Sequence, residues 1–257
     1  MKRRFERRFA EDDAFQVRER LKIGVLGTGR GAGASFLAAS LALRCAARQE
    51  RAVAFAELPD GIGGRQWLYD SVGMDRRFAG RSFVPVHRHV AEGRYIREAR
   101  NMDSRVNWAL CPPADRGLIL SELQQARLLN NLAGDLLIAD LGAAAAPALL
   151  QEMDRIVCVI DPKPSRLIGA RAHYQQMRRL QENGWDVRWV INKYSDAVLR
   201  RCFRDYIRVR EIARLPLLKE IHFYRAEYHC RFPLEQREIE NAVGDLIDDI
   251  VKELALW

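Results

Sequence analysis

A short apolar run, a glycine-rich loop and a helix-forming segment follow one another near the start of the chain. Residues 22–26 have the apolar composition of a buried strand, and residues 36–43 have that of a helix with one apolar face. Residues 27–35 connect them and contain four glycines, which are typical of a tight turn. Strand, loop and helix in this order form the opening of a βαβ unit. The sequence therefore predicts a sheet with parallel strands.

Five further apolar runs of strand length support this prediction, and helix-forming stretches at 121–130 and 166–183 separate several of them. The runs are almost continuously apolar, as expected for parallel strands buried on both faces. We therefore predict an α/β fold with a doubly wound, mostly parallel sheet and helices on both faces. The five runs are 52–56, 106–110, 136–139, 156–160 and 187–191.

Three segments depart from this alternation. Residues 1–20 mix arginine with acidic residues, which predicts a basic N-terminal arm before a single domain at 21–257. Residues 61–105 are rich in glycine, arginine and aromatic residues, which predicts an excursion of short helices and loops outside the sheet. Residues 234–257 place apolar residues on one helical face and acidic residues on the other. We expect this C-terminal amphipathic helix to pack on the domain, because a membrane-surface helix would carry lysine and arginine there.

Composition limits the classes of function. The chain has 42 Lys+Arg against 34 Asp+Glu, and the resulting charge of +8 permits an anionic partner. The surplus is scattered arginine, so nucleic acid is not the favoured partner, and we expect the arginine-rich stretch 200–210 to be a solvated helix face. No apolar run reaches membrane-spanning length, and the first twenty residues lack the apolar core of a signal peptide. We therefore expect a cytoplasmic protein.

The cysteines and histidines do not form a pattern typical of a metal site. The five cysteines are widely spaced, without a CxxC or CxxH pair, and we expect them to be small buried residues. His87 and His89 lack the Cys, Asp or Glu neighbours of a metal centre, so we expect surface histidines.

The loop 27–35 is the strongest candidate for a binding site. Backbone N–H groups and a helix N-terminus converge there and attract anions. The loop also follows the carboxyl end of the first strand, where doubly wound folds bind their ligands. We expect this loop to bind a phosphate group, and the alternative is a tight turn that binds nothing.

Two ligand codes fit the loop. In the phosphate-loop code G-x-x-x-x-G-K-[ST], Gly33 and Ser35 match, whereas Ala34 replaces the lysine and Thr28 the first glycine. In the dinucleotide code G-x-G-x-x-[GA], Gly27, Gly29 and Ala32 match. The second code also needs an acidic residue for the ribose, and Glu57 lies 28 residues beyond Gly29 instead of about 20.

Two later strands end in residues that suit a nucleoside phosphate. Residues 136–142 are an apolar strand that ends in Asp-x-Gly, the pattern of a Walker B strand. Its Asp140 would help to hold Mg²⁺, and Gly142 permits close approach to the γ-phosphate. Asn192 ends the sixth strand, in a position to contact the edge of a base.

Taken in order, the segments 27–35, 57, 140–142, 161–162 and 192–193 resemble the MinD/ParA family of dimeric P-loop ATPases, over roughly residues 21–220. The resemblance implies a P-loop NTPase-like fold, a homodimer, and ATP or ADP with Mg²⁺ as ligands. Family loops read K-G-G-x-G-K-[ST], whereas this chain has Gly29 and Ala34 at the two lysine positions. The implied site has Ser35 and Asp140 at Mg²⁺, Glu57 orienting the attacking water, Asn192 at adenine, Gly142 near the γ-phosphate, and Gly27, Gly29, Arg30, Gly31, Ala32, Gly33, Ala34 and Ser35 at the phosphates.

The missing lysine limits the activity that the resemblance implies. A P-loop lysine offsets charge that develops on the transferring phosphoryl group, so hydrolysis should be slow or absent. Binding should survive, because backbone N–H groups remain. We therefore expect a pseudo-ATPase, at most a weak enzyme, that acts as a dimeric switch or scaffold and localises or assembles other proteins.

Altered loops also occur in the TadZ/CpaE-like subgroup. Resemblance to it would make the partners Flp/Tad pilus machinery and would bring the protein to the cell pole or a membrane face through a partner. Two alternatives stay open. One is an NAD(P)-binding Rossmann oxidoreductase that uses Gly27, Gly29, Ala32 and Glu57, and the other is a scaffold that binds no nucleotide.

Overall fold

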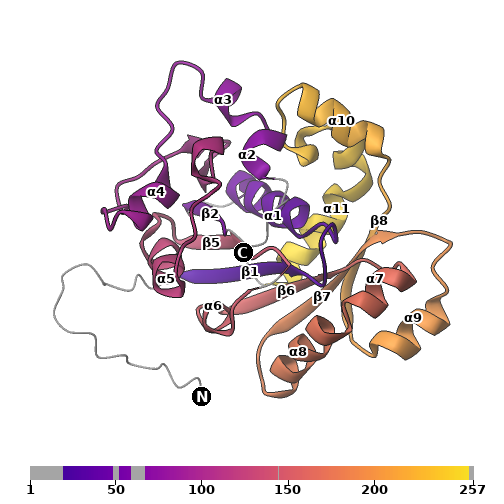
Figure 1. The fold of residues 1–257 in the computed structure, drawn as a ribbon. Helices are drawn as coiled ribbons and strands as arrows, with labels where there is room; N and C mark the ends of the chain where they lie inside the picture. Colours follow the sequence, from indigo (N-terminus) through magenta and orange to yellow (C-terminus); the bar gives the residue numbers. More distant parts are fainter. Residues whose placement is uncertain (1–19, 49–51, 59–66, 144, 255–257) are drawn as a thin grey trace.

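The computed structural model describes residues 20–48, 52–58, 67–143 and 145–254, and the strands in these ranges form one sheet flanked by helices (Figure 1). The strands are β1 (Leu21–Gly27), β2 (Val53–Glu57), β3 (Met102–Asp103), β4 (Val106–Ala109), β5 (Leu136–Asp140), β6 (Arg155–Ile160), β7 (Val187–Tyr194) and β8 (Glu211–Pro216). Their order in the sheet is β3-β4-β2-β5-β1-β6-β7-β8. Only the β3–β4 pair among them is antiparallel. The predicted α/β class with a mostly parallel sheet is confirmed.

Helices cover both faces of the sheet, as predicted. Along β6, Val157 and Val159 face one hydrophobic core, and Ile156, Cys158 and Ile160 face the other. The first core is closed by α1 (Ala34–Arg48), α2 (Leu68–Ser71), α3 (Met74–Arg77), α10 (Glu220–Tyr228) and α11 (Arg237–Glu253). The second is closed by α4 (Val86–Ala91), α5 (Glu122–Asn131), α6 (Pro147–Gln151), α7 (Pro164–Gly169), α8 (Arg171–Glu182) and α9 (Arg200–Ile207).

The six strands expected from apolar runs are confirmed as β1, β2 and β4 to β7. The expected helix at 121–130 is α5, which begins with a capping box because Ser121 Oγ accepts from Gln124 N–H at 3.3 Å and Gln124 Oε1 accepts from Ser121 N–H at 2.9 Å. The stretch 166–183 is not one helix. It divides at Ala170 into α7 and α8, where the backbone leaves helical geometry after Gly169.

The departures from alternation were interpreted correctly in part. The excursion contains the expected short helices α2, α3 and α4, but β3 joins the sheet edge, so the prediction that all of 61–105 lies outside the sheet was wrong. The C-terminal helix α11 packs on the domain through a buried apolar face that includes Ile239, Val243, Ile247 and Val251. The expected basic arm lies outside the described residues, except for Arg20.

Three expectations about single residues were wrong. Cys45, Cys111 and Cys158 are buried, but Cys202 is exposed and Cys230 is half-buried. His87 is almost fully buried rather than at the surface.

The arginines of 200–210 are exposed, as expected. Within the described part of the chain, each helix is too short or too polar to cross a bilayer.

Arg77 ties the excursion to the C-terminal part of the chain. Its guanidinium donates to Asp103 Oδ2 at 2.9 Å, to the Cys230 carbonyl at 3.0 Å and to Glu235 Oε2 at 2.9 Å. It also lies over the ring of Phe232, 4.7 Å from the ring centre. One largely buried cation therefore joins α3, β3 and the short 3₁₀ helix Pro233–Glu235.

We expect Arg77→Met to lower the free energy of unfolding by about 3 kcal/mol, because it leaves two partly buried carboxylates without their partner. Arg76→Met, on the exposed side of the same helix, should change it by less than about 0.5 kcal/mol. Urea unfolding followed by circular dichroism measures both. Equal midpoints for the two variants would contradict the assignment of Arg77 as a structural tie.

Candidate functional site

The glycine loop starts from a fixed point at the carboxyl edge of the sheet. Gly27 N–H donates to the Gly142 carbonyl at 2.8 Å, and Thr28 N–H donates to the Val159 carbonyl at 2.9 Å. Gly142 lies two residues after β5 and Val159 lies in β6, and these two strands flank β1 on its two sides. The loop then leads into α1, whose first intrahelical bond is Leu37 N–H to the Gly33 carbonyl at 3.0 Å. The first N–H groups of α1 have no acceptor within the helix, which makes its start suitable for an anion.

Two glycines of the loop are required by its conformation. Gly31 has φ of +73° and Gly33 has φ of +97°, in the left-handed region that favours glycine. At Gly33, a side-chain Cβ would lie 2.0 Å from Asn192 Nδ2. Any other residue at position 33 would therefore strain the backbone and displace Asn192.

Two acidic residues end neighbouring strands at the same edge. Glu57 on β2 is the register partner of Asp140 on β5, and both are fully buried. Asp140 Oδ1 accepts from Gly142 N–H at 3.0 Å, so the carboxylate shapes the turn that follows its own strand. Asp140 thus lies beside the start of the loop, because Gly142 also accepts the hydrogen bond from Gly27.

The Glu57 carboxylate is held by backbone donors. Oε1 accepts from Leu68 N–H at 2.9 Å, and Oε2 accepts from Cys111 N–H at 3.2 Å. The Glu57 carbonyl is 2.6 Å from Nε2 of the buried His87. Sequence reasoning missed these three partners, since none follows a recognisable motif. The contacts give Glu57 a structural role at the start of α2, and its expected role in orienting water stays a prediction.

The end of β7 reaches the loop from the other side of β1. Asn192 Nδ2 donates to the Ala32 carbonyl at 2.9 Å. Lys193 Nζ donates to the Gly31 carbonyl and lies 3.3 Å from Asp161 Oδ2. The segments 140–142, 161–162 and 192–193 are thereby gathered around the loop. Lys193 was not among the predicted site residues, although its place beside Asn192 was the available signal. The role of Asn192 at a base stays a prediction.

The residues present fit a magnesium nucleotide in donor type. Ser35 and Asp140 offer a hydroxyl and a carboxylate, and Mg²⁺ usually takes one or two such oxygens with phosphates and water. In the described ranges, no group of three or more His, Cys, Asp and Glu side chains could hold a metal by itself. Arg30 is exposed on the loop, and Ala34 presents only a methyl group where a lysine would stand.

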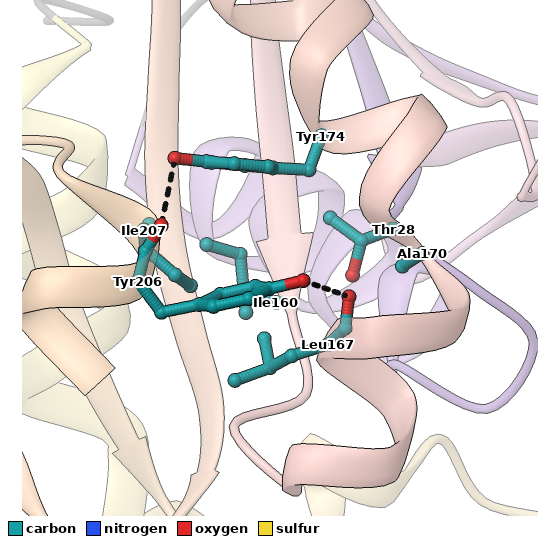
Figure 2. Close-up of a pocket in the computed structure, with 7 residues that line it drawn as sticks. All are labelled: Thr28, Ile160, Leu167, Ala170, Tyr174, Tyr206 and Ile207. Atoms are coloured by element: carbon teal, nitrogen blue, oxygen red, sulfur yellow. Dashed lines mark hydrogen bonds between the residues drawn. The ribbon is translucent and has the colours of Figure 1, made fainter. Parts of the chain in front are cut away.

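A small cavity lies behind Thr28 (Figure 2). Tyr174 OH donates to the Tyr206 carbonyl and Tyr206 OH to the Leu167 carbonyl, both at 3.4 Å, and these contacts join α7, α8 and α9. The cavity has a free volume of about 10 Å³, which is room for one water molecule. This cavity is therefore too small to hold a nucleotide. The lining residues are Thr28, Ile160, Leu167, Ala170, Tyr174, Tyr206 and Ile207.

The order of the strands contradicts the dinucleotide alternative. In the dinucleotide-binding fold, the second strand lies next to the first, and its acidic end reaches the ribose. Here β5 separates β1 from β2, and Glu57 on β2 is held by Leu68 and Cys111. The loop and Glu57 therefore do not form a Rossmann site.

No family model and no curated protein matches the sequence. The fold is similar to solved structures. MinD from Pyrococcus horikoshii complexed with Mg-ADP has a TM-score of 0.67 at 15% identity, with 91% of this chain and 97% of that chain covered. A chain of the MinC:MinD cell division protein complex of Aquifex aeolicus has a TM-score of 0.67 at 16% identity, with 91% of this chain and 96% of that chain covered. A ParA family ATPase from Chlorobium tepidum has a TM-score of 0.61 at 13% identity, with 89% of this chain and 96% of that chain covered. The chain therefore has the α/β fold of the MinD/ParA-type P-loop ATPases.

Proposed function

We propose that the chain binds ATP or ADP with Mg²⁺ at the loop 27–35 and acts as a dimeric switch or scaffold that localises or assembles other proteins. The observation that carries the proposal is the loop itself. Hydrogen bonds to the carbonyls of Gly142 and Val159 fix the start of the loop, and the loop leads directly into α1. Asp140 and Asn192 lie on its two sides. The structurally similar MinD of Pyrococcus horikoshii was solved with Mg-ADP, which supports the same ligand here.

Each group would act on a different part of the nucleotide. The N–H groups of the loop and of the start of α1 would bind the phosphates, while Ser35 and Asp140 would hold Mg²⁺. Mg²⁺ supplies charge neutralisation at the phosphates. The methyl group of Ala34 offers no charge to a transferring phosphoryl group, so that binding is retained and hydrolysis is slow or absent.

An exposed apolar stripe on α10 supports the homodimer. Ile221, Tyr224 and Tyr228 are between 50% and 85% exposed and follow one face of α10 at spacings of three and four, and Leu217, just before the helix, is 58% exposed. The opposite side of α10 packs through Phe223 against Phe36, with ring centres 5.7 Å apart. Phe36 directly follows Ser35, so α10 lies between the candidate site and the stripe. A second copy at this stripe would contact the helix that packs on Phe36.

The partner system follows from resemblance alone. The TadZ/CpaE-like subgroup makes Flp/Tad pilus machinery the first system to examine. Recruitment by such a partner would bring the protein to the cell pole or a membrane face.

We expect isothermal titration to give micromolar binding of ATP and ADP with Mg²⁺ and none of NADH. Gly33→Asp should abolish binding, because it adds a negative charge to the phosphate site and displaces Asn192. Gly117→Asp, at an exposed position with open space around it, is the matched control and should bind as the wild type does. Wild-type protein that is silent with every nucleotide would leave the scaffold alternative as the better account.

Ala34→Lys should restore a cation at the phosphates. We expect it to raise steady-state ATP hydrolysis at least about tenfold above a slow wild-type rate, since one stabilising group in a site can contribute a hundredfold or more. Phosphate release measures the rate, and an unchanged unfolding midpoint controls for folding. Equal rates for the wild type and a variant that still binds ATP would show that the lysine is not what limits hydrolysis.

Ile221→Glu with Tyr224→Glu should prevent dimer formation, because both place a charge on the exposed stripe. Light scattering after size exclusion, with Mg-ATP present, should give a dimer for the wild type and a monomer for the double variant. Ile119→Glu, at an exposed position outside α10, is the control and should remain dimeric. A dimeric double variant would place the interface elsewhere.

A further inference from the structure

The end of β7 is irregular at the point where it meets the glycine loop. In a regular strand, neighbouring side chains point to opposite faces of the sheet. Here the pairing of β7 with β8 shifts register between Ile191 and Tyr194, and Lys193 has φ of +57°. Asn192 and Lys193, although adjacent, therefore both reach the same loop. Irregularities of this kind re-aim side chains and occur often beside active sites.

The two side chains hold consecutive peptide groups of the loop. Asn192 Nδ2 donates to the Ala32 carbonyl at 2.9 Å, and Lys193 Nζ donates to the Gly31 carbonyl. The carbonyl and N–H of one planar peptide group point in opposite directions. Holding the Ala32 carbonyl on the β7 side thus directs the Gly33 N–H to the other side of the loop. A carbonyl oxygen turned to that other side would repel a phosphate instead.

Asp161 fixes the ammonium group of Lys193 from the end of β6. Its Oδ2 is 3.3 Å from Lys193 Nζ, and its Oδ1 accepts from Lys163 N–H at 3.0 Å. Asp161 is itself buried. A backbone with positive φ at a lysine costs free energy and persists only where other contacts hold it. The contacts of Lys193 with Gly31 and Asp161 are of this kind.

We propose that Asn192 and Lys193 form a clasp that holds the glycine loop in its phosphate-binding conformation, and that Lys193 is thereby a positioning residue for a loop that has no lysine of its own. The inference rests on the proposed binding of ATP or ADP and names the part of the chain that prepares the loop for their phosphates. Lys193 lies on β7, 162 residues after the Gly31 that it contacts, and it acts on the loop rather than on the reacting atoms.

Lys193→Met tests the clasp, because it keeps the length of the side chain and removes the ammonium group. Hydrogen exchange of the amides at 29–37 in the free protein should become at least tenfold faster. Affinity for Mg-ATP in isothermal titration should fall at least tenfold, which corresponds to about 1.4 kcal/mol. Lys163→Met, which removes an exposed lysine two residues from Asp161, is the matched control and should change both quantities less than twofold. Lys193→Arg, which retains a donor and a charge, should restore slow exchange.

The two readouts separate the clasp from the proposed function. Faster exchange in Lys193→Met together with no ATP binding by the wild type would support the clasp as a brace of the loop and overturn nucleotide binding. Unchanged exchange would overturn the clasp, and so would faster exchange with unchanged ATP affinity. Should Lys193→Met fail to fold, Lys193→Gly removes the same ammonium group and tolerates the positive φ, and the same outcomes apply to it.

Discussion

The glycine loop depends on its attachment to the two strands that flank β1. Gly27 N–H donates to the carbonyl of Gly142, just after β5, and Thr28 N–H donates to the carbonyl of Val159 on β6, so the loop leaves the sheet at a fixed place between these strands. Parallel pairing places the ends of β2, β5, β6 and β7 at the same edge. Side chains that are far apart in sequence, such as Asp140 and Asn192, can therefore reach one loop. The strand order also decides against the dinucleotide alternative, because β5 separates β1 from β2 and its Glu57.

The sequence predicted those parts of the fold that bury a continuous apolar surface. β5 and β6 are almost entirely apolar because both of their faces are covered, and their residue pattern needs no tertiary information. β8 was missed because it is an edge strand, in which glutamate, arginine and proline interrupt the apolar residues. β3 has only two residues, and its pairing with β4 makes it a strand. Elements defined by their neighbours in space lack a signal in their own sequence.

The same distinction applies to the candidate site. Asp140 and Asn192 could be placed because each ends an apolar run, and parallel strands bring such ends together. The contacts of Glu57 with Leu68 and Cys111 could not be predicted from the sequence, because the donors are backbone N–H groups of loop-rich segments without periodicity. His87 illustrates a related difficulty, since a polar residue in a short helix reads as exposed unless the carbonyl that it contacts is known. Lys193 depends on a register shift that no spacing rule reveals.

For the proposed nucleotide, the arrangement favours binding over hydrolysis. Catalysis needs groups that stabilise the transition state more than the ground state. Under the proposed function, backbone N–H groups of the loop would act on bound phosphates whether or not a bond is breaking, while Asn192 and Lys193 contact only the loop. Meanwhile Ala34 contributes no charge, and both carboxylate oxygens of Glu57 already accept backbone hydrogen bonds. A glycine loop with no lysine at position 34, beside a helix that exposes Ile221, Tyr224 and Tyr228 on its other side, suits the proposed role, in which a partner recognises a bound state.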